Sequence, residues 1–173
     1  MNNIYKMKKY IFLSLFVVFM AFSVSGQKYA YLNSTQLLLE LPEVKAADSE
    51  LEAYQKSLIA KGEDMVKKFE EKYNGYVQQA QSGSLTGVQM QQRESELAQE
   101  QQAIQAYEQE VQQLIVTKRE ELYKPILDKV NVVVEQIGKD NGYTMIFDSS
   151  IGGLLYAVEA DNIMDMVKTK LGI

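Results

Sequence analysis

The sequence predicts a mostly helical α+β protein in which a long antiparallel helical hairpin projects from a small body that contains strands. Three observations lead to this prediction. Apolar residues recur at helical spacing over 43–80, and a second helical segment follows the cluster of Gly, Ser and Thr at 81–87. Short runs rich in β-forming residues lie near both ends of the chain that remains after its leader.

The leader has the features of a secretory signal peptide. An apolar run at 11–22 follows three lysines and is succeeded by small and polar residues. The alternative, an uncleaved membrane anchor, is disfavoured because this run is shorter than the roughly 20 residues that span a bilayer. We expect residues 1–26 to be removed, with Gly26 or Ser25 as the last residue of the leader. The absence of Cys excludes lipid attachment and disulfides, so packing or oligomerisation must stabilise the fold.

Composition excludes several functional classes. Removal of the leader takes away three of the 18 basic residues and none of the 23 acidic ones, which leaves a formal charge of −8 and argues against a nucleic-acid partner. The chain has no His and no Cys, so it cannot form a His-based triad, a thiol nucleophile or an ordinary zinc site. We expect no enzyme activity, no catalytic or metal-binding residues and no cofactor.

The first elements of the body come directly after the leader. The alternating pattern of KYAYLN at 28–33 predicts a short strand, and STQLLLEL at 34–41 predicts one or two helical turns with Asn33 or Ser34 as the cap. Pro42 is suited to the first position of a new helix. We assign 27–42 to the body.

The helical hairpin, here called the arm, is assigned to 43–123 with its tip at 81–87. The first helix, over 43–80, would be about 57 Å long, which is too long for the interior of a domain of this size. The second helix runs from Val88 to about Gly138. Pro125 either kinks it where the arm joins the body or starts a separate helix.

The remainder of the body is assigned to 124–173. Two β-rich runs around Ser-Ser-Ile-Gly-Gly within 140–157 predict a β-hairpin, and 161–173 predicts a short amphipathic helix. One early strand and two late ones offer few core residues and leave exposed edges. We therefore expect the body to be shared between copies of the chain, although periodicity does not give their number.

These segments together resemble the Skp (OmpH) family of periplasmic chaperones. The resemblance covers essentially the whole chain after its leader, and its most specific parts are AYLNSTQLLLELPEVKAA at 30–47 and NGYTMIFDSS at 141–150 leading into GGLLYA. It implies a jellyfish-like homotrimer with a β-barrel-like body and three arms around a cavity. It also implies that unfolded outer-membrane proteins, the clients, are held in the cavity without ATP in the periplasm until membrane insertion.

On this resemblance, particular arm residues gain candidate roles. Flexible or amphipathic side chains suit contact with varied clients, whereas Tyr54, Phe69 and Tyr73 are assigned to the contact between the two helices. Gly62 and Gly75 are either flexing points or sites of close helix packing, and Pro125 is a third flexing candidate. The candidates for client contact are Met65, Tyr76, Met90 and Tyr107.

The charge of the arm departs from part of the family pattern. Some members carry basic arms that attract acidic clients and have been linked to lipopolysaccharide, whereas residues 61–100 here are mildly acidic. Electrostatic capture and any peripheral contact with the membrane or lipopolysaccharide are correspondingly disfavoured. An alternative function is an exported coiled-coil adaptor for one folded envelope partner. The ten Gln residues and scattered apolar residues of 89–113 disfavour it, because a fixed partner requires a continuous apolar stripe.

Overall fold

The computed structural model describes residues 26–173, so the predicted signal peptide lies outside the described residues except for Gly26. The described chain divides into two compact units. One, the body unit, contains residues up to Ser34 together with Val134–Gly172, and the other, the hairpin unit, contains Thr35–Val133 with the final residue Ile173. Among the described helices, none is both long and apolar enough to cross a membrane.

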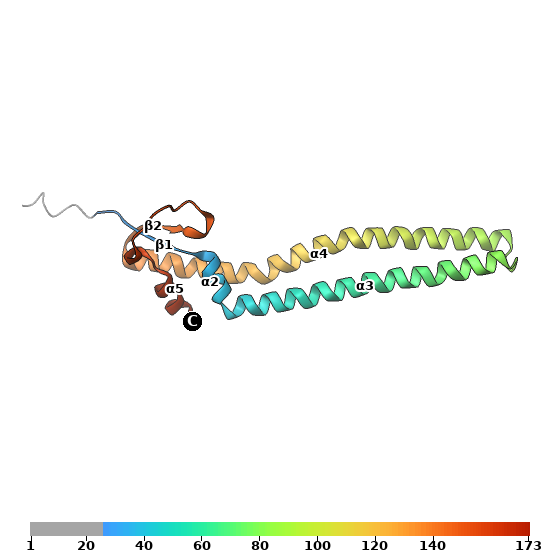
Figure 1. The fold of residues 1–173 in the computed structure, drawn as a ribbon, viewed down its shortest axis with the longest axis horizontal. Helices are drawn as coiled ribbons and strands as arrows, with labels where there is room; N and C mark the ends of the chain where they lie inside the picture. Colours follow the sequence, from blue (N-terminus) through green and yellow to red (C-terminus); the bar gives the residue numbers. More distant parts are fainter. Residues whose placement is uncertain (1–25) are drawn as a thin grey trace, which may run out of the picture. The chain divides into compact units, whose positions relative to one another are not determined.

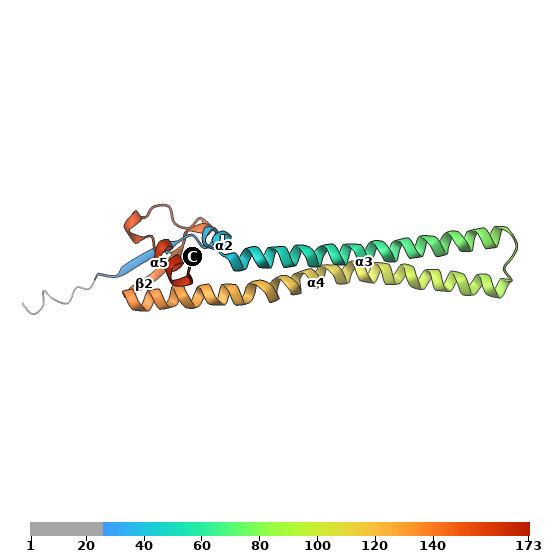
Figure 2. The ribbon, with the colours of Figure 1, turned by 90° about the horizontal axis from the view of Figure 1, so that it is seen from below.

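The hairpin unit is built from two long antiparallel helices that run side by side in both ribbon views (Figures 1 and 2). The first, α3, spans Pro42–Gln81, and the second, α4, spans Gly87–Asn141 and extends beyond this unit. The short helix α2 (Ser34–Glu40) precedes α3. Pro42 occupies the first turn of α3, where its missing amide hydrogen would have no intrahelical partner.

The turn between α3 and α4 is made by residues with local conformational preferences. Gly83 has a positive φ of 69°, which glycine adopts without steric cost. At the start of α4, the Thr86 amide and hydroxyl both donate to Gln89 Oε1 at 2.9 Å, and the Gln89 amide donates back to the Thr86 hydroxyl at 3.3 Å. This reciprocal arrangement is a capping box, and it defines where the second helix begins.

Helix α4 passes through Pro125 without interruption. The alternative in which Pro125 starts a separate helix is therefore wrong. The proline ring removes the amide hydrogen that would bond to the carbonyl of Glu121, so one intrahelical hydrogen bond is missing at this point of α4. A kink at Pro125 that joins the arm to the body stays a prediction.

The hairpin unit includes more of the chain than the segment 43–123. The structure groups residues 35–42 and 124–133 with the two helices. At this end, Lys129 Nζ lies 2.6 Å from Glu43 Oε1 and Val130 is buried, so α3 and α4 remain in contact up to the first turn of α3. The extent of this helix–helix contact depends on facing residues that are far apart in sequence.

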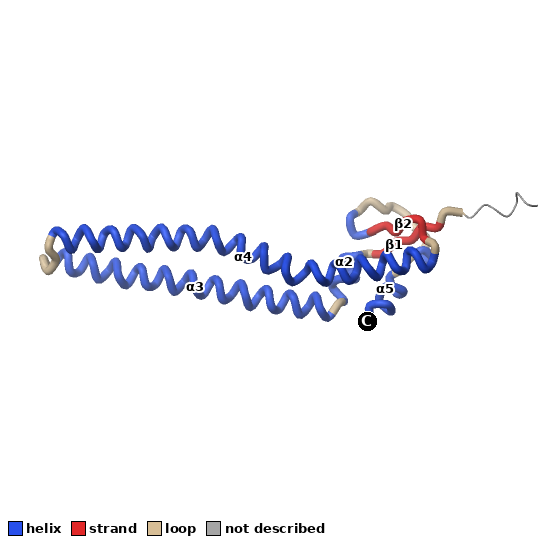
Figure 3. Tube along the Cα trace, turned by 180° about the vertical axis from the view of Figure 1, so that it is seen from behind, coloured by secondary structure: helices blue, strands red, loops and turns tan. Residues whose placement is uncertain are grey.

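The body unit is organised around two parallel strands, drawn in red in Figure 3. Strand β1 (Lys28–Leu32) pairs with β2 (Tyr143–Asp148), with Ala30 opposite Ile146. An isolated bridge from Tyr31 to Asn162 extends this pairing, and the helix α5 (Met164–Leu171) follows it. The core of the unit is apolar; its buried residues are Ala30, Leu32, Ile137, Ile163, Met164 and Val167.

The β-hairpin expected within 140–157 is not formed in the structure. Only its first half is a strand, and after β2 the chain enters a 3₁₀ helix, η1 (Ser149–Ile151), because Asp148 accepts a hydrogen bond from the Ser150 amide. Gly152, with a φ of 74°, then turns the chain, and 152–158 contains no strand. A second 3₁₀ helix, η2 (Glu159–Asp161), precedes α5. The partner of β2 is therefore β1, from the other end of the chain.

Candidate functional site

The two helices of the hairpin unit meet along one line of facing side chains, here called the seam. Every buried residue of α3 lies at or before Leu58. Beyond Leu58, polar contacts join the two helices: the Lys72 ammonium group pairs with Glu100, and the Tyr76 hydroxyl donates to Glu94. The half of the hairpin next to the turn is therefore held by less buried apolar surface, and we expect it to open at lower free energy.

Tyr107 of α4 is the most buried aromatic side chain of the seam, with 6% of its surface exposed. Its hydroxyl donates to the carbonyl oxygen of Leu58 at 3.0 Å, which satisfies the polar end of the ring. Gly62 lies against the ring, since a Cβ atom on this glycine would be 3.5 Å from Tyr107 Cε1. For Gly62 the structure therefore supports close helix packing, which is one of its two predicted roles.

The contact at Gly62 leaves room for a methyl group beside the Tyr107 ring, which gives a testable prediction. We expect Gly62→Ala to stabilise the hairpin by about 0.5–1 kcal/mol, because 3.5 Å is an ordinary van der Waals separation and Ala favours the helix. Gly62→Leu should destabilise it, since the longer side chain displaces Tyr107. Thermal unfolding followed by circular dichroism measures both changes.

Gly75 supplies the matched control for these variants. A Cβ atom on this glycine would meet no heavy atom within 4 Å, so both Gly75→Ala and Gly75→Leu are expected to leave the seam intact and to stabilise the helix. Equal behaviour of Leu at positions 62 and 75 would contradict the tight contact between Gly62 and Tyr107.

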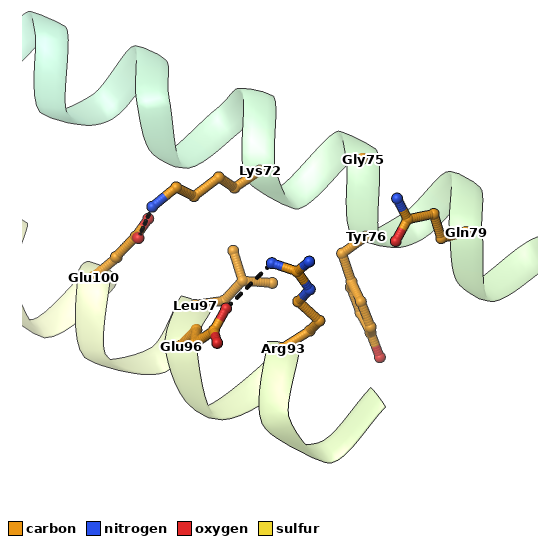
Figure 4. A pocket seen from close by; sticks show the side chains of 8 residues that line it. All are labelled: Lys72, Gly75, Tyr76, Gln79, Arg93, Glu96, Leu97 and Glu100. Atoms are coloured by element: carbon orange, nitrogen blue, oxygen red, sulfur yellow. Dashed lines mark hydrogen bonds and ion pairs between the residues drawn. The ribbon is translucent and has the colours of Figure 1, made fainter. Parts of the chain in front are cut away.

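A hollow of about 180 Å³ surrounds Gly75 in the outer half of the hairpin (Figure 4). Gly75 and Tyr76 of α3 face Arg93 and Leu97 of α4 across it. The Arg93 guanidinium lies 3.3 Å from Glu96 on the same helix, so the charged groups drawn there are paired. The absence of a side chain at Gly75 leaves this part of the helix pair incompletely filled, which is compatible with either flexing or packing.

The four client-contact candidates are not brought together at one place. Tyr76 and Tyr107 line two separate hollows of the hairpin, whereas Met65 and Met90 are half-buried and line neither of these two. Tyr107 lies in the seam, so only the part of its ring that faces a hollow is accessible. The structure thus separates the candidates into two that line these hollows and two that line neither of them.

Sequence reasoning misses the most exposed apolar side chains of the arm. On α3 these are Ile59, Val66 and Tyr73, although the sequence pattern assigns Tyr73 to the seam. They follow one another at seven-residue intervals, one position after Leu58, Met65 and Lys72. This second heptad repeat is visible in the sequence, but it is easily merged with the repeat that forms the seam. Val88 and Val116 are the exposed apolar residues of α4 within 43–123.

The body unit also exposes apolar side chains, and several of these belong to β2 and to the segment that follows it. Leu155 and Tyr156 are 97% and 83% exposed, and Phe147 lies 6.2 Å from Tyr29 between ring centroids. Tyr29, Phe147 and Tyr156 contribute to a hollow of about 300 Å³. A strand edge and large apolar groups at the surface are features of sites that bind another protein chain.

One polar network joins the carboxyl ends of β1 and β2 inside the body unit. Asp148 accepts hydrogen bonds from the Ser34 hydroxyl at 2.5 Å, the Ser34 amide at 3.1 Å and the Ser150 amide at 2.9 Å. Partial burial acts to raise the pKa of Asp148, but these hydrogen bonds outweigh it and lower the pKa to about 2. The network holds the ends of two strands that are distant in sequence.

No group of three or more acidic residues is arranged to hold a metal ion among the residues from 26 onward. The polar clusters found there, such as Asp148 with Ser34, fix backbone segments. The candidate functional features are therefore surfaces: the hollows of the hairpin unit and the apolar surface of the body unit.

Comparisons with known proteins show which family the chain belongs to. The model of the family described as outer membrane protein (OmpH-like) matches residues 28–171. A solved structure from Caulobacter crescentus CB15 that is described as OmpH-like has a similar fold, with a TM-score of 0.72 and 14% identity over 85% of each chain. No curated protein matches the chain. Because the family model covers nearly all of the described residues, the chain belongs to the OmpH-like family of outer membrane proteins, the Skp (OmpH) family.

Proposed function

We propose that this protein is an ATP-independent periplasmic holdase, a chaperone that binds unfolded outer-membrane β-barrel proteins and prevents their aggregation before insertion. The observation that carries this proposal is the family match over 28–171, which contains the whole hairpin and nearly the whole body. The long helix pair with little buried apolar surface in its outer half supports the same function, since clients of different sizes require a compliant container.

We further propose that three copies of the chain assemble through the body unit and hold clients between their arms. The exposed Leu155 and Tyr156 and the open edge of β2 support assembly, because such surfaces are stabilised by contact with another chain. Gly75 and Pro125 are proposed as the flexing points of the arm. Gly62 has the alternative role of a packing contact with Tyr107.

Client contact is proposed to come from dispersed apolar groups of the arm. Met65, Tyr76 and Met90 are partly exposed, and Tyr107 contributes the edge of its ring to a hollow. Contacts of this kind have no fixed geometry, which suits clients of unrelated sequence. The mildly acidic arms give no support to a lipopolysaccharide or membrane partner.

The proposal is tested with the mature protein from Gln27 onward and without nucleotide. A urea-denatured outer-membrane β-barrel protein is diluted into it while turbidity is recorded, and light scattering gives the mass of the chaperone. We expect suppression of turbidity at about one trimer per client, as for a closed symmetric assembly with one cavity. A monomer or dimer without suppression would contradict the proposal. A preference for the folded client would instead favour the coiled-coil adaptor.

A further inference from the structure

One side of the hairpin unit carries a groove with an apolar floor. It encloses about 380 Å³ and is lined by residues of both helices. Ile59 and Val66 of α3 contribute exposed side chains, 58% and 40% accessible, and Ile104 and Tyr107 of α4 complete the apolar part. Exposed apolar groups beside a hollow favour binding of another apolar side chain.

The rim of this groove is acidic and its carboxylates are unpaired. Glu63, Glu70 and Glu108 line the groove, and none of their carboxylates forms an ion pair or hydrogen bond with another residue between 26 and 173. The only basic residue among the described lining residues is Lys67, whose ammonium group lies 4.0 Å from the carboxylate of Glu71. The groove therefore presents uncompensated negative charge around an apolar floor.

The Tyr107 ring on the floor already has one cationic neighbour. The ammonium group of Lys61 lies 4.5 Å from the centroid of the Tyr107 ring, in a cation–π contact. Lys61 does not line the groove. A cationic group that enters from the groove would therefore be attracted by the rim carboxylates rather than by this ring.

A permanent helical partner does not fit this surface. Beside the seam, α3 exposes one large apolar residue per heptad, namely Ile59, Val66 and Tyr73. A third helix packed on the pair requires two apolar positions per heptad. Isolated apolar contacts of this kind suit a flexible segment that inserts single side chains. The acidic rim then determines the charge of the residues that can flank an inserted side chain in that segment.

We propose that this groove binds client segments in which an apolar side chain is flanked by Lys or Arg. The inference rests on the proposed holdase function and specifies the class of segment that the arms retain. Segments with Asp or Glu next to the apolar side chain are repelled by Glu63, Glu70 and Glu108. A basic arm would have the opposite preference, for segments in which Asp or Glu flanks the apolar side chain.

The experiment uses the full mature protein and two fluorescent peptides. Both peptides are unstructured and share the same Leu and Phe residues, which are flanked by Lys in one peptide and by Glu in the other. Binding is measured by fluorescence anisotropy. We expect the Lys-flanked peptide to bind about 10-fold more tightly at ~0.01 M salt and the two affinities to converge at ~1 M salt, where the Debye length is about 3 Å.

Paired charge variants locate the selectivity. Glu63→Gln with Glu70→Gln should reduce the affinity ratio of the two peptides by at least about 3-fold, because two rim charges are removed. The control, Glu120→Gln with Asp165→Asn, changes the net charge equally at exposed sites of α4 and α5 that do not line the groove. It should leave the ratio unchanged. Equal effects of the two pairs would overturn the groove as the site, since net charge alone would then explain the preference.

The same preparations are tested for suppression of client turbidity, which separates the two proposals. A protein that suppresses aggregation but binds both peptides equally overturns the groove inference and leaves the holdase function intact. A protein that does not suppress aggregation overturns the holdase function. If it still prefers the Lys-flanked peptide through Glu63 and Glu70, the groove remains a selective site on the arm.

Discussion

Replacing Leu155 and Tyr156 with Lys is expected to convert the proposed trimer into monomers without unfolding the chain. Both side chains are almost fully exposed in the single chain, so they contribute little to its packing. In an assembly, burial of each would contribute about 1.5–3 kcal/mol per chain, and an introduced ammonium group would also have to be desolvated. The measured mass should fall to that of one chain, with unchanged helical circular dichroism.

Loss of assembly should also abolish suppression of client aggregation, because a cavity between arms requires several arms. The matched control is Val88→Lys with Val116→Lys, which makes the same chemical change at exposed apolar residues of the arm. We expect this control to retain the native mass. If the Leu155 and Tyr156 variant also retained it, the apolar surface of the body would not be the contact between copies.

Replacing Asp148 with Ala is expected to release the ends of β1 and β2 from each other. The change removes the acceptor for the Ser34 hydroxyl, the Ser34 amide and the Ser150 amide, and it leaves the two amides without this partner in a partly buried site. Hydrogen bonds to a charged group contribute about 1.5–3 kcal/mol each, and the contributions within one network are not additive, so we expect a total loss of about 2–4 kcal/mol.

The same carboxylate makes the stability of the body unit dependent on pH. The pKa of Asp148 is lowered in the folded chain from 3.8 to about 2, so its ionised form is favoured by folding. The resulting stabilisation is fully present above pH 3.8 and is lost as the pH falls through this window to about 2. Its size is on the order of 2 kcal/mol, because one pKa unit corresponds to about 1.4 kcal/mol.

Hydrogen exchange resolves this effect, because it reports on the body unit separately from the hairpin. The amides of β1 and β2 should exchange faster in Asp148→Ala, and their protection in the unaltered protein should decrease between pH 3.8 and about 2 after correction for intrinsic exchange. Asp165→Asn, at an exposed position in the first turn of α5, is the control and should change strand protection little. Unchanged protection in Asp148→Ala would show that the network does not stabilise the strands.

The hairpin is predictable from the sequence because its determinants are local. The apolar repeat from Val44 to Leu58, the proline at the start of α3 and the capping residues at the start of α4 each act within a few residues. The mostly helical α+β class that follows from them is confirmed by the structure. Strand β1 is predictable for the same reason, since its alternation is contained within the strand.

The features of the structure that the sequence does not predict depend on contacts between distant residues. The pairing of β2 with β1 cannot be read from 140–157, where the two glycines equally suggest a hairpin turn; it is decided by Asp148 and its bonds to Ser34. The position of Tyr107 in the seam is likewise decided by Gly62, which faces it from the other helix. A tyrosine on a polar helix gives no local sign of whether its partner is a glycine or water.

The parallel pairing of β1 with β2 also determines the order in which the chain can fold. Ser34 and Asp148, which close the strand ends, are 114 residues apart, whereas α3 and α4 are connected by a short turn. Contacts across a short turn form early, and contacts with large sequence separation form late. In the proposed export, which the predicted signal peptide would start at the amino terminus, β1 therefore enters the new compartment long before its partner. The arm can fold while β1 is still unpaired, and the body is completed only when nearly all of the chain has crossed.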